Sequence, residues 1–229
     1  MSTLIQSLSA LAAAGALMFS APLDAAAPQH DVDGELFLIN RQWRVSEYYV
    51  PQVRVAKVSG QVRNMRPDAA AALEEMFAAC KAETGASMVS VSGYRSWGKQ
   101  NLLYSRKVKR TGSKEKADEY VARPGASEHQ LGLAMDLGQK SKSNLTASFG
   151  RTKAGRWAAE NSWRFGFILR YQEGWEDVTG YEFEPWHVRY VGRENAEKIY
   201  QADLPLETYL QKIRGETLLS IVTGEIIED

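Results

Sequence analysis

The sequence predicts an α+β domain in which a small, mainly antiparallel sheet is flanked by helices. Three observations indicate this class. Strand-like and helix-like segments are mixed without a regular βαβ order, and no internal repeat is visible. Neither a GxGxxG nor a GxxxxGKS/T loop occurs, so a nucleotide-binding sheet has no support. With 229 residues, the chain is long enough for one well-cored domain with extensions.

The composition is that of an ordinary globular protein, with 44% hydrophobic and 24% charged residues. Basic and acidic residues both number 28, so the formal net charge is zero. This balance argues against a general nucleic-acid binder, which normally carries a basic excess. The single cysteine, Cys80, is expected to be a small buried core residue. It excludes an intrachain disulfide and a cysteine-based zinc site.

The N-terminus has features of an export signal. Residues 4–23 carry no charge and are followed by small residues, as in a secretory signal, and the run is also long enough for a marginal membrane span. No basic residue precedes Arg41, so the usual positive n-region is missing. We expect an export signal, a membrane anchor or a disordered extension at 1–32. A folded domain is expected at 33–215 and an acidic tail at 216–229. An exported chain would be extracytoplasmic.

The domain is expected to begin with two extended segments, 34–45 and 48–58, and Pro51 disfavours a helix in the second. The clearest helix lies in "RPDAAAALEEMFAACKAETG", where Asp68 can cap the N-terminus and Gly85 fits a C-terminal stop. Its apolar residues form one stripe, made by Leu73, Met76, Phe77 and Cys80.

Shorter strands and helices alternate in the rest of the domain. Strands are expected at Met88–Ser92, at Phe167–Tyr171 and in "PWHVRYVG", whose β-branched and aromatic residues favour strands. The expected helices lie at Trp97–Arg110, in "KEKADEYVARPG", and at Lys153–Trp163, Arg193–Gln201 and Leu206–Ile213. The stretch "ASEHQLGLAMDL" is typical of a loop that runs into a strand.

Two histidines of the domain have polar company that a core histidine would not need, in "SEHQLGLAMD" and "FEPWHVRY". A catalytic zinc site takes three imidazole or carboxylate ligands and leaves one position for water, and His129, Asp136 and His187 would supply such a set. His129 and Asp136 are an odd number of residues apart, so a straight strand would point them to opposite faces. They can share an ion only if the chain bends, and Gly132 permits a bend. The spacing alone is a common pattern.

Glu184 lies three residues before His187, at the entrance to the last expected strand. A carboxylate beside an activated water can accept its proton during attack and deliver that proton to a leaving amine. The alternative is a solvated loop acid.

Arg95 lies in a second polar cluster, "SGYRSWGKQ", just after a strand-to-helix turn. Its guanidinium can bind a substrate carboxylate or stabilise an oxyanion, and Gln100 can face the same opening. The alternative for Arg95 is a solvated arginine at a helix start. No serine lies in a G-x-S-x-G context, so a serine nucleophile has little support.

Taken together, "SGYRSWGKQ", "PGASEHQLGLAMDL" and "YEFEPWHVRYVG" resemble the zinc D-alanyl-D-alanine carboxypeptidases related to the vancomycin-resistance carboxypeptidases. The resemblance covers about residues 36–201. It implies a Hedgehog/D-Ala-D-Ala peptidase-like fold and one Zn²⁺ bound by His129, Asp136 and His187. It also implies catalytic or substrate-binding roles for the remaining polar residues of these motifs, namely Glu184 as general base with Arg95, Gln100 and Ser127 at the substrate.

The implied activity is removal of the C-terminal D-alanine from peptidoglycan stem peptides outside the cytoplasm. D,D-carboxypeptidase activity is favoured. An L,D-carboxypeptidase acting on tetrapeptide stems and a peptidoglycan endopeptidase of the same fold are the alternatives within the enzyme class. A zinc-stabilised module and a wall-binding module without catalysis are the alternatives outside it. Loop shape decides the specificity, and neither it nor the oligomeric state can be read from the sequence.

Overall fold

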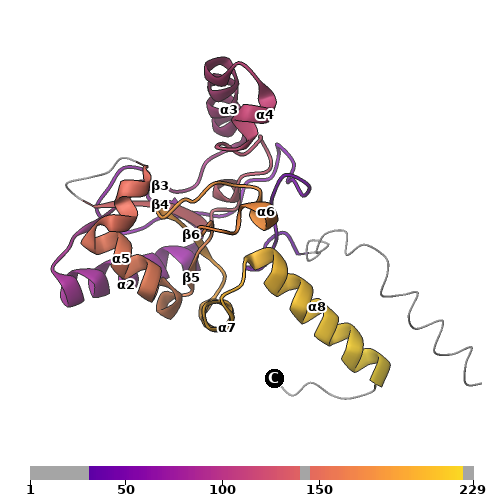
Figure 1. Cartoon of the computed structure of the whole chain (residues 1–229). Coiled ribbons are helices and arrows are strands. Elements are labelled where there is room, and N and C mark those ends of the chain that lie inside the picture. The colour runs from indigo at the N-terminus through magenta and orange to yellow at the C-terminus, as the bar shows by residue number, and fades with distance from the viewer. Residues whose placement is uncertain (1–30, 140–144, 224–229) are drawn as a thin grey trace, which may run out of the picture.

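The computed structural model of the chain describes residues 31–139 and 145–223 (Figure 1). The expected signal or anchor at 1–32 lies outside them except for its last two residues, as does the end of the expected acidic tail. Within the described ranges, no helix combines the length and the apolar character that crossing a membrane requires.

Four antiparallel strands form the main sheet, in the order β3-β4-β6-β5. Two shorter strands, β1 and β2, pair separately. The strands are β1 Arg54–Val55, β2 Asn64–Met65, β3 Met88–Ser92, β4 Ala134–Gln139, β5 Phe167–Leu169 and β6 His187–Tyr190. The prediction of an α+β fold with a small antiparallel sheet is therefore confirmed.

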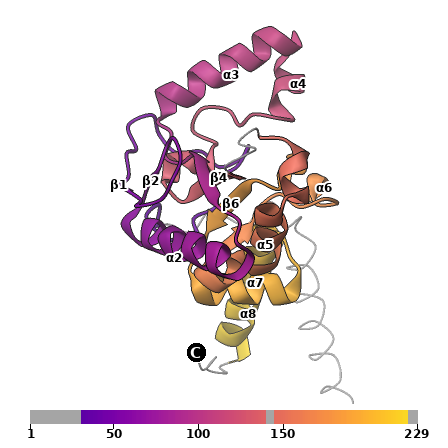
Figure 2. The same cartoon turned by 90° about the vertical axis from the view of Figure 1, so that its left-hand side faces the viewer.

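Helices lie on both sides of this sheet. Figures 1 and 2 show α3 and α4 set apart on one side, with α2, α5 and α7 on the other. The α-helices are α2 Pro67–Thr84, α3 Trp97–Thr111, α4 Lys114–Asp118, α5 Lys153–Asn161, α6 Glu176–Thr179, α7 Arg193–Ala202 and α8 Leu206–Thr223. Three 3₁₀ turns join them: η1 Glu128–Leu131, η2 Ala147–Arg151 and η3 Ser162–Phe165.

Alternation along the two central strands separates the core from a polar face. Met135 and Leu137 of β4 and Val188 of β6 are fully buried in the main core with α2 and α5. Because successive side chains of a strand point to opposite faces, the adjacent residues Asp136 and His187 point to the other side. The sheet thus has an apolar face toward the core and a polar face toward α3.

Three expectations about the elements are corrected. Asp68 does not cap α2, because Pro67 occupies the first helical position and Arg66 precedes it without a side-chain cap. Asp68 instead lies in the first turn, where a carboxylate favours the positive helix end. The segment 34–45 is not continuously extended, because turns and bends interrupt it at 34–36 and 40–43. Helix α8 continues to Thr223 instead of ending near Ile213.

The other features of α2 agree with the sequence. Its apolar stripe is buried, including Cys80, which is a free thiol with no exposed surface. Gly85 ends the helix in the left-handed conformation, with φ of 73°.

Candidate metal centre and active site

Strand register brings Asp136 and His187 together. Asp136 of β4 pairs directly with His187 of β6, so the two side chains are neighbours on the polar face of the sheet. His129 comes from η1, which ends at Gly132 with φ of 70°. A Cβ at Gly132 would lie 3.0 Å from Val53 Cγ1, so both the conformation and the space favour glycine. The predicted bend at Gly132 is confirmed, and it turns His129 back toward Asp136.

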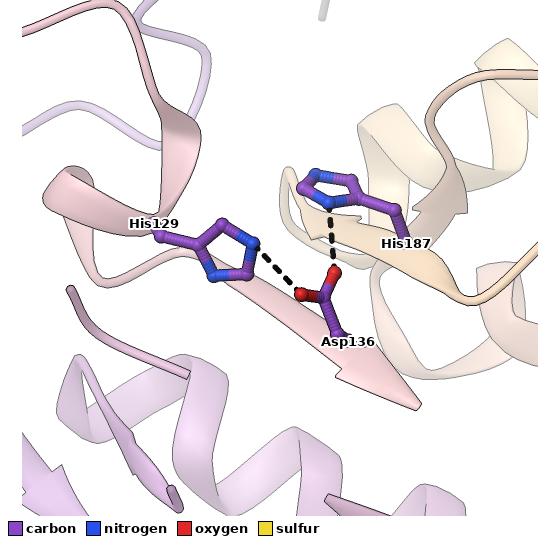
Figure 3. Close-up of side chains that lie close together, drawn as sticks. All are labelled: His129, Asp136 and His187. Carbon is purple, nitrogen blue, oxygen red and sulfur yellow. Dashed lines mark hydrogen bonds and ion pairs between the residues drawn. The ribbon is translucent and has the colours of Figure 1, made fainter. Parts of the chain in front are cut away.

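The three side chains converge on one point (Figure 3). His129 Nε2 lies 3.3 Å from Asp136 Oδ2, and His187 Nδ1 lies 3.1 Å from Asp136 Oδ1. One ligand atom from each residue falls within 4.8 Å of the others, and all three residues are buried. Burial opposes ionisation of Asp136, but the two imidazoles outweigh it and hold the pKa of its carboxyl well below the ordinary value.

Each histidine is oriented by a partner on its other ring nitrogen. His129 Nδ1 lies 2.9 Å from the carbonyl oxygen of Gly93, and since a carbonyl only accepts, Nδ1 must carry the proton. His187 Nε2 lies 3.0 Å from Glu128 Oε2. Partners of this kind fix the tautomer of a metal-binding histidine. They leave His129 Nε2 and His187 Nδ1 directed at Asp136.

Glu128 belongs to a buried network behind His187. Its Oε1 accepts hydrogen bonds from Arg170 Nε at 2.8 Å and from Arg189 Nη1 at 2.9 Å. Arg170 also donates two hydrogen bonds to Glu207 of α8, at 2.9 and 2.6 Å. Burial opposes the charge on Glu128, but the two guanidinium groups keep its pKa well below the ordinary value. We call Glu128, Arg170, Arg189 and Glu207 the buried network.

Glu184 lies beside this centre without belonging to the ligand set. Its Oε2 is 3.8 Å from His187 Nδ1, and its side chain is 19% exposed, so it borders the opening. Burial, opposed by His187 and assisted by Asp136, raises the pKa of Glu184 to about 7. A metal cation beside this carboxyl would lower that pKa and favour the ionised form, which a general base requires.

Arg95 faces the same centre from the turn before α3. Its Nη2 is 3.6 Å from Asp136 Oδ2 and donates to Ser92 Oγ at 2.9 Å. Its Nη1 donates to Gln100 Oε1 at 2.7 Å, while Gln100 Nε2 donates to the carbonyl oxygen of Ala122 at 2.6 Å. Both ends of the Gln100 amide are therefore bound within the protein. The expected direct contact of Gln100 with substrate stays a prediction.

One cleft of about 630 Å³ is lined by all seven predicted site residues. They are Arg95, Gln100, Ser127, His129, Asp136, Glu184 and His187. Ser127 is buried immediately before η1. The structure thus brings together residues spread over 93 positions of the sequence, from 95 to 187.

The donor set fits a zinc ion. Two imidazole nitrogens and one carboxylate form a usual ligand set of catalytic zinc, and a fourth position remains for water. The orienting partners Gly93 and Glu128 supply the outer contacts that such ligands normally have.

Sequence reasoning missed the buried network. Glu128 adjoins His129, but its local sequence indicates no separate role. A signal was present in the strands, because Arg170 follows "FIL" and Arg189 lies within "HVRYV", so both arginines stand in otherwise apolar runs. A charged residue at such a position is rarely buried without a partner. Nothing near Glu207 in the sequence marks it as the partner of Arg170.

The sequence of the chain is similar to those of several known proteins. Residues 62–193 match the family described as VanY, D-alanyl-D-alanine carboxypeptidase. The YodJ protein of Bacillus subtilis is 42% identical over 187 residues, which cover 78% of this chain and 68% of that protein. A D-alanyl-D-alanine carboxypeptidase of Enterococcus faecalis is 40% identical over 187 residues, which cover 76% of this chain and 65% of that protein. The chain therefore spans about two thirds of the length of these relatives.

The chain is also similar to solved structures. The LD-carboxypeptidase LdcB matches with a TM-score of 0.75 and 41% identity, covering 80% of this chain and 88% of LdcB. A vancomycin-resistance D,D-pentapeptidase, VanY, in complex with Zn(II) matches with a TM-score of 0.66 and 37% identity. That match covers 77% of this chain and 98% of the VanY chain.

Proposed function

Because the chain belongs to the VanY family of D-alanyl-D-alanine carboxypeptidases, we propose that it is a zinc-dependent enzyme that removes the C-terminal D-alanine from peptidoglycan stem peptides. The observation that carries the proposal is the meeting of His129, Asp136 and His187 with Glu184 in one cleft. The zinc-bound VanY structure supports the choice of metal. The ligand set takes one ion.

Zinc held by the three ligands would polarise the scissile carbonyl and lower the pKa of water. Glu184 borders the open side of the set, where its carboxylate can accept a proton from the attacking water. It then delivers this proton to the amine of the departing D-alanine. This mechanism contains no covalent intermediate on the protein, so a β-lactam is not expected to acylate the enzyme.

Arg95 binds the terminal carboxylate of the substrate or the carbonyl next to it, because its guanidinium is a planar, bidentate donor. Ser92 and Gln100 hold that guanidinium in place. Ser127, on the wall of the same cleft, supplies a hydroxyl toward the terminal residue. Gln100 contributes through Arg95.

D,D-carboxypeptidase activity is our first choice, because the matching family and the Enterococcus faecalis relative are described by that activity. L,D-carboxypeptidase activity is the second candidate, since the LD-carboxypeptidase LdcB matches with the higher TM-score of the two solved structures. A peptidoglycan endopeptidase of the same fold is the third. Stem peptides lie outside the cytoplasmic membrane, so we propose that the enzyme acts there.

The test is incubation of the zinc-loaded full chain with pentapeptide and tetrapeptide muropeptides and with a cross-linked dimer, followed by mass spectrometry. Loss of one alanine from the pentapeptide alone is the expected result. Loss from the tetrapeptide alone would establish L,D-specificity, and cleavage of the dimer alone would establish an endopeptidase. Chelation should stop the reaction and added zinc should restore it. No release from any substrate, with stoichiometric zinc bound, would refute the proposal.

A further inference from the structure

The cleft that holds the metal ligands continues along helix α3. Its lining runs from buried Gln100 at the inner end to three basic residues farther along the helix. We call these three residues, Arg106, Lys107 and Arg110, the basic face of α3. Figure 2 shows α3 on the side of the sheet opposite α2. The metal ligands face the α3 side, because Arg95, just before α3, lies 3.6 Å from Asp136.

Helical spacing explains why these side chains share one wall. Gln100, Leu103, Lys107 and Arg110 are separated by three, four and three residues, so they lie on one side of α3. With a rise of about 1.5 Å per residue, the basic face lies roughly 9–15 Å along the helix from Gln100. A set of cations is thus held at a fixed distance along α3 from Gln100, at the inner end of the cleft.

No carboxylate of the described chain neutralises the basic face. Lys107 Nζ lies 4.0 Å from the centre of the Tyr120 ring, and Arg106 and Arg110 form no ion pair within residues 31–139 and 145–223. Other arginines are paired, for example Arg123, which binds Asp118 at 2.5 Å. Burial lowers the pKa of Lys107, and the like charge of Arg110 adds to this effect.

The acidic residues nearest in sequence to the basic face do not pair with it. Asp118 accepts hydrogen bonds from Tyr104 and Arg123. Glu115 and Glu119 form no ion pair among the described residues, and neither lines the cleft. Like charges that gather at one end of a cleft without an acidic partner favour an anionic ligand.

The substrate itself can supply this anion. In a carboxypeptidase the substrate ends at the reacting bond, so its last residue occupies the inner end of the cleft near Arg95. The outer half of α3 lines the same cleft, and we infer that the rest of the peptide passes along it. An extended chain advances about 3.3 Å per residue, so 9–15 Å corresponds to roughly three or four residues.

We propose that the basic face of α3 is a subsite for a carboxylate that the substrate carries about three residues before its terminal D-alanine. The assignment rests on the proposed carboxypeptidase function and adds a substrate class to it, namely acidic peptides. The subsite binds the substrate at a distance from the reacting atoms. It therefore changes the preference of the enzyme for acidic over neutral peptides.

The experiment compares two synthetic peptides that differ in one side chain. Both end in the D-alanyl dipeptide that the wild type cleaves, with glutamate or glutamine three residues before the terminal D-alanine. The measured quantity is the ratio of kcat/KM for the glutamate peptide to kcat/KM for the glutamine peptide. In Arg106→Gln/Lys107→Gln/Arg110→Gln this ratio is expected to fall about three- to ten-fold, as loss of partly screened charges predicts.

A charge-matched control separates the subsite from net charge. Lys99→Gln/Lys109→Gln/Lys114→Gln also removes three positive charges from α3 and α4, but at positions that do not line the cleft. The control should keep the wild-type ratio. Raising the salt concentration from 0.05 to 0.5 M should move the wild-type ratio toward one, because the Debye length shortens.

A wild-type ratio near one, or an equal fall in both triple variants, would overturn the subsite. Failure of the proposed function has a different signature, since neither peptide would then lose alanine. In that case the subsite is tested by calorimetry, which measures the affinity of the wild type and of both triple variants for the same two peptides. Equal affinity for the glutamate and glutamine peptides would refute it.

Discussion

The buried network reaches the cleft through Glu128, and the basic face of α3 lines the same cleft, but the charged side chains of the two regions lie in different surroundings. In the buried network each carboxylate accepts hydrogen bonds from an arginine, and Arg170 and Arg189 are almost completely enclosed. Displacing a charge there would leave its partner unpaired in a medium of low dielectric, so the geometry is fixed. The cations of the basic face are more exposed and have no acidic partner among residues 31–139 and 145–223, so salt screens them. One region can hold reacting groups in place, while the other can select substrates.

Glu184→Gln is expected to have the largest effect. Glutamine cannot accept the proton of the attacking water, so kcat should fall by about a thousand-fold. Bound zinc, measured by elemental analysis, should remain stoichiometric because Glu184 is not one of the three ligands. Glu182→Gln, two residues earlier and exposed, is the matched control. Near-normal turnover of Glu184→Gln would show that Glu184 is not the general base.

Glu207→Gln should destabilise the fold more than any loss of a surface pair. Glutamine is neutral and has one acceptor oxygen, so one of the two hydrogen bonds from Arg170 is lost and the other loses its charged acceptor. Breaking a buried pair costs about 3 kcal/mol of the free energy of unfolding. The control is Glu74→Gln, which removes a partly exposed pair with Arg54 and should cost less than about 1 kcal/mol. Urea unfolding of the zinc-loaded proteins measures both. An equal loss of unfolding free energy in the two variants would contradict the proposed difference between buried and exposed charges.

Glu128→Gln tests whether the buried network acts on the metal ligands. Replacing the carboxylate that holds His187 Nε2 should weaken zinc binding about 10- to 100-fold, as loss of an outer partner usually does. Competition with a chromogenic chelator measures the affinity. Glu75→Gln, which breaks an exposed pair with Arg193, should leave zinc affinity unchanged. A purely structural role for Glu128 would lower stability without this change in affinity.

Asp118→Asn should have the smallest effect, and the effect should depend on pH. Hydrogen bonds from Arg123 and Tyr104 outweigh burial and hold the pKa of Asp118 below its ordinary value. A depressed pKa means that the ionised group stabilises the fold above the unfolded pKa of about 3.9, and that this stability is lost as the pH falls through the folded value. The variant should therefore be about 1 kcal/mol less stable than the wild type at pH 7, with a smaller difference in acid. Urea midpoints at pH 7 and pH 3 test this, and a difference that does not change with pH would contradict it.

Much of the site could be predicted from the sequence because its residues lie in three short motifs. The predicted bend between His129 and Asp136 requires a residue that tolerates positive φ, and Gly132 supplies it. Periodicity likewise identified α2 and β3. The helix start at Pro67 was missed because a proline at the first position and a carboxylate within the first turn resemble a capped end.

The remaining contacts depend on strand register and tertiary packing, which local patterns do not contain. Asp136 faces His187 only because β4 pairs with β6 in one register. The partners of Arg170 come from positions 42 residues earlier and 37 residues later. The apolar runs around the two arginines indicate burial, but they do not indicate which carboxylates share it.

The bonds of Arg170 and Arg189 also determine how short a self-sufficient fragment can be. The family match ends at residue 193, whereas Arg170 is bound by Glu207 and Arg189 donates to the carbonyl oxygens of Glu35 and Phe37. A polypeptide cut to 62–193 would leave two guanidinium groups enclosed without these acceptors. We therefore expect the smallest autonomous unit to span about residues 35–210, with a chain segment from each side of the matched region supporting the strand that carries His187.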